Sequence, residues 1–219
     1  MITHKFDTII GNIPQGWQAI ELRKLLLDHS AGDWGDEDGE IGLKIIRSTN
    51  FTDAGHLDFS DVAVRYFQER SIEKFGLKIG DILLERSGGG PDQPVGRVGF
   101  ITENMGWYWV SNFVQVLRPN PDTIDPRYLG WTLFELQRTG IIERLQQQST
   151  QMRNLNYRDY LRMKVPVPPL PTQKSIALAI DAASRTIASL VSELEAAKQV
   201  KDSMLQNLLI GEQRREENA

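Results

Sequence analysis

The sequence contains no cysteine among its 219 residues. A disulfide framework, a thiolate zinc site and a cysteine nucleophile are therefore excluded, and the composition suits a reducing cytosol. No run of about eighteen apolar residues occurs, and the segment that begins at Met1 lacks the apolar core of a signal peptide. We expect a cytoplasmic protein without a membrane-spanning segment.

The chain also has little that resembles catalytic machinery. Its three histidines are far apart in sequence and lack the spacing of metal ligands. The glycines that begin at Gly88 are not followed by the Gly-Lys-Ser/Thr of a phosphate loop. Asp81 and Glu85 with Arg86 faintly resemble a nuclease carboxylate pair, but the usual lysine after Glu85 is missing. The sequence predicts no catalysis, with a nuclease as the weakest alternative.

Charge is slightly acidic overall, with 25 Lys+Arg against 29 Asp+Glu, but it is unevenly distributed. Residues 1–40 hold three basic and eight acidic side chains, whereas residues 144–164 hold five basic side chains against Asp159 alone. A local basic surface is therefore compatible with the acidic total. The acidic stretch 32–40 lacks the oxygen spacing and distal glutamate of a calcium loop, so we interpret it as a solvated loop.

Short apolar runs bounded by Gly, Pro, Asn or Asp indicate β-strands at residues 43–46, 62–64, 81–84, 98–101, 108–110 and 113–117. Asp125 followed by Pro126 is typical of a helix start, and apolar residues continue at helical spacing until Gly140. A second short helix is predicted to begin at Asn156. Residues 1–165 are therefore predicted to form a strand-rich domain, which makes the chain α+β.

The segment VPVPPLP at residues 165–171 must be extended, because proline fixes φ and disfavours helical backbone in the residue before it. We interpret residues 166–171 as a hinge, with a free Pro-rich ligand as the weaker alternative. A long helix is predicted over 172–211, closed by Gly211, and a charged tail over 212–219.

Apolar residues in the long helix follow a 4-3 spacing, which is typical of a coiled-coil seam. Some 38 residues make a rod of roughly 57 Å, longer than the ~30 Å width of a domain of this size. A helix folded back on its own domain is therefore the weaker alternative, and we predict pairing with another long helix. The seam positions assigned to this interface are Ile180, Ile187, Leu190, Leu194, Met204 and Leu208.

Polar segments rich in hydrogen-bonding groups recur at the ends of the predicted strands. Arginine can bracket the two acceptors of a guanine, Asn and Gln can bracket an adenine, and hydroxyls with glycine N–H groups can reach phosphates. This chemistry predicts direct base readout, with capped turns and solvent-facing loops as the alternative. The candidate DNA-binding residues are Arg47, Ser48, Asn50, Arg86, Ser87, Gly88, Arg97, Asn112, Gln151 and Arg153.

An ordered set of segments along residues 13–211 resembles the specificity subunits of type I restriction–modification enzymes. The matching segments are IPQGW (13–17), RSTN (47–50), GDILLERSG (80–88), NFVQVLRP (112–119), DPRYL (125–129) and VPVPPL (165–170) ahead of Gln173 and the long helix. It is the ordered set, with the proline segment and the helix, that is specific. Members usually have Glu before this Gln, where the present chain has Thr172.

The resemblance implies a function and a set of partners. Typical members are similar to two tandem copies of this unit, in which the helices pair antiparallel and each domain reads half of a split DNA site. The chain is thereby expected to be a half-length, non-catalytic specificity subunit that homodimerises through an antiparallel coiled coil and reads an interrupted palindrome. The implied partners are double-stranded DNA, a methyltransferase (modification) subunit and a translocating restriction subunit. No cofactor is implied for this chain, because S-adenosylmethionine belongs to the methyltransferase.

A scaffold protein is the alternative from another functional class. It would use the coiled coil for assembly and the sheet for protein contacts, without sequence-specific DNA binding. Binding to duplex DNA with a steep salt dependence separates the two hypotheses, because each neutralised phosphate releases counterions.

Overall fold

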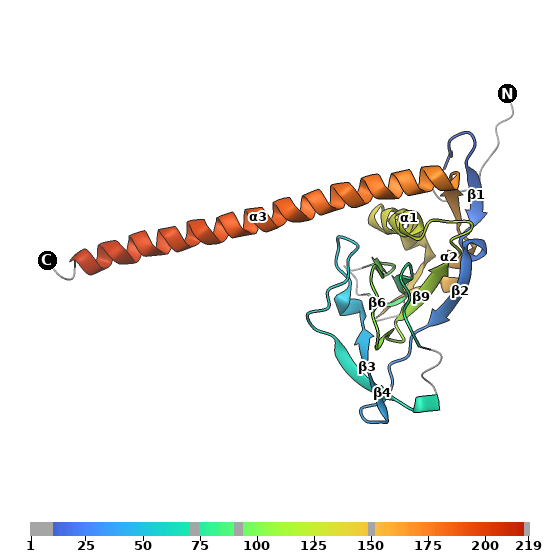
Figure 1. Cartoon of the computed structure of the whole chain (residues 1–219), viewed down its shortest axis with the longest axis horizontal. Helices are drawn as coiled ribbons and strands as arrows, with labels where there is room; N and C mark the ends of the chain where they lie inside the picture. The colour runs from blue at the N-terminus through green and yellow to red at the C-terminus, as the bar shows by residue number, and fades with distance from the viewer. Residues whose placement is uncertain (1–10, 71–74, 90–93, 149–151, 217–219) are drawn as a thin grey trace. The chain divides into compact units, whose positions relative to one another are not determined.

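The computed structural model describes residues 11–70, 75–89, 94–148 and 152–216 (Figure 1). Contacts divide the chain into two units, Met1–Ile176 and Ala177–Ala219. The α+β class and the long C-terminal helix predicted from the sequence are confirmed.

The strands are β1 (Gln18–Glu21), β2 (Leu26–Ala31), β3 (Ile41–Ile46), β4 (Ala63–Phe67), β5 (Ile82–Glu85), β6 (Ser87–Gly89), β7 (Val98–Phe100), β8 (Tyr108–Val110), β9 (Val114–Pro119), β10 (Gln146–Gln148), β11 (Arg153–Leu155) and β12 (Lys164–Val167). The helices are α1 (Pro126–Arg138), α2 (Tyr157–Arg162) and α3 (Leu170–Glu216), with short 3-10 turns at Leu22–Leu25, Ser48–Asn50 and Ile141–Leu145.

The first unit is built around a four-stranded antiparallel sheet in the order β2-β9-β5-β7. All four residues of β5 are buried, and so are most of those of β9. Strands covered on both faces need apolar side chains at most successive positions, which is why Ile82–Leu84 and, apart from Gln115, Val114–Leu117 are apolar. A three-stranded sheet, β4-β3-β8, pairs β3 antiparallel with β4 and parallel with β8.

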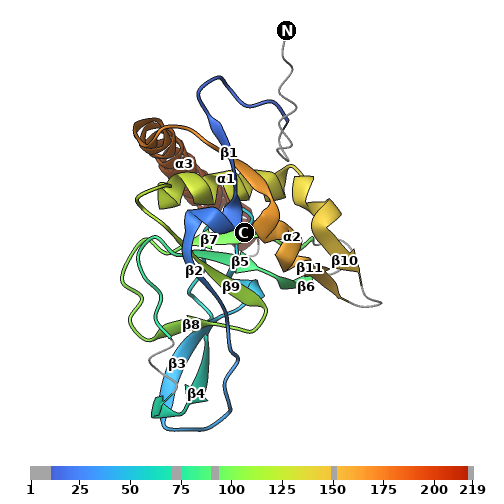
Figure 2. The same ribbon diagram turned by 90° about the vertical axis from the view of Figure 1, so that its right-hand side faces the viewer.

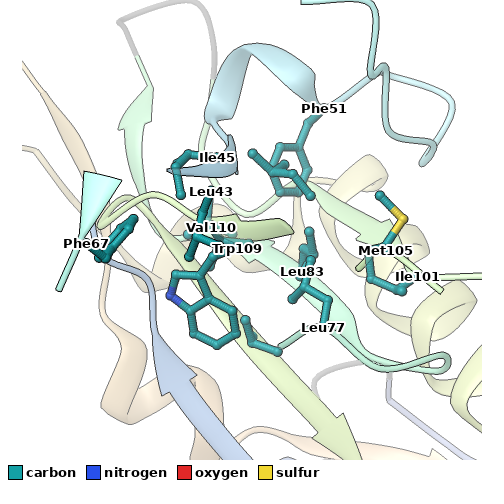
Figure 3. Close-up of a cluster of buried hydrophobic side chains, with 13 residues drawn as sticks. Leu43, Ile45, Phe51, Phe67, Leu77, Leu83, Ile101, Met105, Trp109 and Val110 are labelled. Carbon is teal, nitrogen blue, oxygen red and sulfur yellow. The ribbon is translucent and has the colours of Figure 1, made fainter. Parts of the chain in front are cut away.

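A cluster of buried apolar side chains joins the two sheets (Figure 3). Leu43 and Ile45 of β3 and Trp109 of β8 belong to it together with Leu83 of β5 and Val116 of β9. Burying a large apolar side chain stabilises a fold by about 1.5–3 kcal/mol, so these contacts are a major source of the stability of this unit.

Helix α1 begins where the sequence predicts. The carboxylate of Asp125 accepts hydrogen bonds of 3.0 Å from the backbone N–H groups of Arg127 and Tyr128, and Pro126 occupies the first turn. Gly130 lets the helix approach β7 closely, because a Cβ there would lie 1.9 Å from the Phe100 ring. The start predicted for the second helix is confirmed as well, since Asn156 caps α2.

The proline segment is extended at residues 165–167, where it forms part of β12, but its last two residues, Leu170 and Pro171, are helical. Residues of β12 pair antiparallel with β1, with Val165 opposite Ile20 and Pro166 opposite Ala19. Proline is tolerated there because β12 is an edge strand of a two-stranded sheet. Helix α3 then begins at Leu170, two residues earlier than predicted.

Gln173 fixes the start of α3 within the first unit. It is 1% exposed, and its Oε1 accepts a 2.7 Å hydrogen bond from the backbone N–H of Asp125. Its Nε2 donates to the carbonyls of Pro168 (2.7 Å) and Thr123 (3.4 Å). One buried carboxamide thus ties the first turn of α3 to the start of α1.

The second unit is the remainder of α3, which continues through Gly211 to Glu216. The prediction that Gly211 closes the helix is therefore wrong: an interior glycine costs only about 1 kcal/mol relative to alanine, which its helical neighbours tolerate. By length and composition Leu170–Leu209 could cross a membrane, since one 18-residue window has a mean hydropathy of 1.2. This is weak evidence, because that stretch contains charged residues from Lys174 onward, among them Asp181, Arg185 and Glu193.

Two buried ion pairs hold loops against the central sheet. Arg97 donates to both oxygens of Glu85 (2.8 and 2.9 Å), to the carbonyl of Phe51 (3.0 Å) and to that of Ser48 (2.9 Å). Arg118 donates to both oxygens of Asp81, each at 2.8 Å. Asp81 and Glu85, which in sequence faintly resemble the carboxylate pair of a nuclease, are each 1% exposed. Each of them forms an ion pair with an arginine.

Loss of Arg97 should strongly destabilise the protein. Arg97→Ala leaves Glu85 buried and unpaired, and breaking a buried pair in this way typically costs about 3–5 kcal/mol. The matched control is Arg138→Ala, which removes an exposed pair with Glu135 and should leave the urea midpoint nearly unchanged. Equal urea midpoints for the two variants would contradict the role assigned to Arg97.

Candidate nucleic-acid interface

Four polar segments predicted at strand ends meet around β6. The Ser48 hydroxyl donates to the Ser87 carbonyl at 3.2 Å. The backbone N–H groups of Arg86 and Ser87 donate to the Phe113 carbonyl at 2.8 and 3.2 Å, and the N–H of Leu155 donates to the Arg86 carbonyl at 2.8 Å. Strand β11 also pairs with β6 and lies between β6 and β10 in a three-stranded sheet (Figure 2). We call residues 47–50, 86–89, 111–113, 146–148 and 152–155 together the polar surface.

Arg86 lies in the middle of the polar surface and is half-buried. Gln115 of β9, itself buried, accepts a 3.0 Å hydrogen bond from Arg86 Nη1 and donates to the Ser30 carbonyl at 3.2 Å when its amide is oriented to satisfy both neighbours. Burial raises the pKa of the nearby Tyr157 hydroxyl, and the Arg86 guanidinium partly offsets that rise. The guanidinium is thus anchored on one side by the protein, which reduces the rotamer entropy it would lose on binding a ligand.

Gly88, Asn112 and Phe113 are the exposed members at the centre of the surface. Gly88 has φ +106°, and a Cβ there would lie 3.1 Å from Ser48 Oγ, so this position requires glycine. The Phe113 side chain, 37% exposed, was missed by the sequence analysis. It begins a run that is apolar on both faces of β9, so strand periodicity gave no signal that this ring faces solvent.

Three predicted DNA-binding residues are interior residues instead. Asn50 is 3% exposed; its Oδ1 accepts from the Arg47 N–H and its Nδ2 donates to the carbonyls of Asp58 and Asp61, each at 2.8 Å. Arg97 is 9% exposed, and its hydrogen bonds to Glu85 raise its pKa despite the opposing effect of burial. Ser87 is 5% exposed. Burial of these three side chains inside the domain argues against the DNA contact predicted for them.

The remaining residues predicted to bind DNA differ in their exposure and in their contacts. Arg47 is half-buried and pairs with the exposed Asp61 at 3.0 Å, a contact that solvent screens. Arg153 lies on β11 opposite Gly89 of β6. Gln151 lies outside the described residues. Within the described part of the chain no group of three His, Asp or Glu side chains could hold a metal ion.

The surface thus presents the Arg86 guanidinium and the exposed carboxamides of Asn112 and Gln147 on an α+β domain. That combination is typical of a DNA-recognition module. Residues 38–199 match the family described as type I restriction modification DNA specificity domain. Because the match covers most of the sequence, the chain belongs to this family, whose members supply the DNA-recognition specificity of type I systems and are in general non-catalytic.

A curated relative and three solved structures are similar to this chain. It is 26% identical over 203 residues to the MjaX type I restriction enzyme specificity subunit of Methanocaldococcus jannaschii, an alignment that covers 92% of this chain and 47% of the relative. The HsdS subunit of Thermoanaerobacter tengcongensis matches with a TM-score of 0.57 at 13% identity over 81% of this chain and 44% of its own length.

Two further structures share the fold. The S subunit of M. genitalium matches with a TM-score of 0.57 at 17% identity, over 88% of this chain and 45% of its own. A chain from a structure that describes complex assembly and conformational transition of the type I system matches with a TM-score of 0.58 at 20% identity. The match covers 82% of this chain and 41% of that chain. The chain therefore spans about half the length of the relative and of these structures.

Arg86 is expected to be a base-reading residue. Arg86→Ala should weaken binding to the preferred duplex by about 5- to 150-fold, because a bidentate contact to guanine contributes about 1–3 kcal/mol. Arg86→Lys keeps the charge but not the planar fork, so it should lose discrimination while keeping non-specific binding. Fluorescence anisotropy on preferred and scrambled duplexes measures both, with Arg138→Ala as control. An equal loss on all sequences would assign Arg86 to phosphate contact.

Proposed function

We propose that this chain is the sequence-specific DNA-binding subunit of a type I restriction–modification system, that it dimerises to read an interrupted palindrome, and that it positions methyltransferase and nuclease subunits. The observation that carries the proposal is the polar surface, which four distant segments build in a chain of the DNA specificity family. The chain supplies recognition and no catalysis. We place its action in the cytoplasm, where its DNA target lies.

Helix α3 supports dimerisation. Five of the six predicted interface residues are exposed, from Leu194 at 54% to Leu208 at 65%, and Ile180 is half-buried. A stripe of large apolar side chains along a helix is unfavourable in water and is stabilised by pairing with a second helix. Two copies in antiparallel arrangement would supply the two domains and two helices that the family resemblance implies for typical members.

The exposed apolar surface of α3 is broader than a two-helix seam requires. It also includes Leu178, Val191, Val200, Leu205 and Leu209. We assign this additional surface to binding of the methyltransferase subunit, which would bring S-adenosylmethionine. A translocating restriction subunit would join the complex through the methyltransferase subunit. Because the chain is slightly acidic, we expect weak DNA binding until the methyltransferase adds cationic surface.

Charge placed in the seam should abolish dimerisation. Leu190→Glu with Leu194→Glu buries two carboxylates per helix against an apolar partner and should give a monomer. Ser192→Glu with Ala196→Glu adds the same charge at the same spacing away from the seam and should remain dimeric. Sedimentation velocity distinguishes the two. A double Leu variant that stays dimeric would show that α3 is not the interface.

A dimer with two-fold symmetry presents identical loops in opposite orientations, so it would read two inverted, identical half-sites. The length of α3 then limits the separation of the half-sites. Its 47 residues span about 70 Å, or roughly 20 base pairs, and the spacer is shorter because the domains overlap the helix ends.

Lengthening the helix should lengthen the spacer. Seven residues inserted after Ala188 keep the seam in phase and add about 10.5 Å, so the preferred spacer should grow by about three base pairs with the half-sites unchanged. Mapping of methylated adenines in cells that also express the methyltransferase measures this. An asymmetric site, or a spacer indifferent to the insertion, would contradict the model.

A scaffold function is the second candidate. Strand β4 and the loops next to the β4-β3-β8 sheet expose Val64 (53%), Trp107 (62%) and Phe59 (36%), large apolar side chains of the kind that protein partners cover. A scaffold would bind mixed-sequence duplex only weakly and without preference. A steep loss of binding with added salt, together with discrimination among sequences, favours the DNA-recognition function.

A further inference from the structure

The ribbon formed by β10 and β11 has an unusual composition. Residues 146–155 contain five carboxamide side chains and no carboxylate, and Arg153 is the one charged residue. The two strands pair antiparallel, with Gln147 directly opposite Asn154. Strand β11 also pairs with β6, so the ribbon continues into the centre of the polar surface (Figure 2).

The two faces of the ribbon differ. Gln146 donates from Nε2 to the Val95 carbonyl at 3.0 Å, and Leu155 opposite it is buried, so these two residues face the domain interior. Because side chains alternate along a strand, Gln147 and Asn154 lie on the opposite face. Directly opposed residues have Cβ atoms about 4.5–5.5 Å apart, so the two carboxamides are neighbours.

Neither carboxamide forms a hydrogen bond within the described part of the protein. Gln147 is exposed and Asn154 half-buried, and over the described ranges of the chain neither side chain makes a hydrogen bond. This contrasts with Asn50, Gln115 and Gln173, whose amide groups are all used inside the fold. Two adjacent carboxamides therefore offer paired donors and acceptors to a ligand.

The chemistry that matches this pair is the major-groove edge of adenine. The amino group of a carboxamide can donate to N7 while its oxygen accepts from the N6 amino group. The same ribbon carries a cation and no carboxylate, which suits the negative potential of DNA. The backbone N–H of Leu155 in β11 donates a hydrogen bond to the Arg86 carbonyl, which places the ribbon beside the arginine that we expect to read guanine.

We propose that Gln147 and Asn154 are specificity-determining residues that read A·T base pairs in the major groove. The proposal rests on the proposed function, because it assigns a base preference to part of the same surface. It predicts that each half-site contains A·T pairs under the ribbon, next to the position that Arg86 contacts.

The test begins with the full-length chain and a random-sequence duplex library, from which preferred duplexes are selected. Each adenine of the preferred duplex is then replaced by 7-deazaadenine, which lacks the N7 acceptor. At the adenines under the ribbon the replacement should weaken binding of the unmodified chain by about 5- to 100-fold. Gln147→Ala or Asn154→Ala should cause a comparable loss of affinity for the normal duplex. Binding of each variant should no longer be weakened by the deaza replacement at one of those adenines.

Gln68→Ala is the matched control, because Gln68 is an exposed carboxamide outside the polar surface, and it should keep both the affinity and the deaza sensitivity. The inference is overturned if the variants keep full deaza sensitivity, or if they weaken all sequences equally while the unmodified chain discriminates; the proposed function then stands. If the unmodified chain selects no sequence, the proposed function and this inference fail together.

Discussion

The buried ion pair between Arg97 and Glu85 is the interaction on which the polar surface depends. One guanidinium joins the end of β5 to the carbonyls of Ser48 and Phe51, which lie far away in sequence. Glu85 is followed directly by Arg86, so the pair also fixes the backbone from which Arg86 projects. In a low-dielectric interior such a pair is stable only with all its hydrogen bonds in place, which makes the arrangement rigid.

Burial separates two roles among chemically identical side chains. Asn50, Gln115 and Gln173 are interior residues with satisfied carboxamides, whereas Asn112 and Gln147 are exposed. A buried amide left without a partner costs about 1–3 kcal/mol, so the interior residues are held in place by the fold. The exposed residues carry no such constraint and are available to a ligand.

Elements with a strong local signal could be predicted from the sequence. Asp125 with Pro126 marks the start of α1, Asn156 that of α2, and apolar runs mark β5 and β9. Strands β6, β10 and β11 could not be predicted, because Ser-Gly-Gly and Gln-Gln-Gln have no apolar alternation. They become strands only by pairing with β11, which for β6 is a partner more than 60 residues away along the chain. The predicted hinge at 166–171 included Pro166 and Val167 of β12, because their partner strand β1 lies near the other end of the domain.

The sequence by itself determined the chemistry of the site segments, the α+β class and the apolar stripe of the long helix, since composition and periodicity are local properties. Only the tertiary structure decided which members of those segments face solvent. Arg86 and Arg97 are alike in sequence, each next to a strand and close to glycines, yet one lies on the surface and the other is bound to Glu85. The physical reason is that burial and hydrogen-bond partners come from segments distant along the chain, and those pairings are made only when the sheets pack.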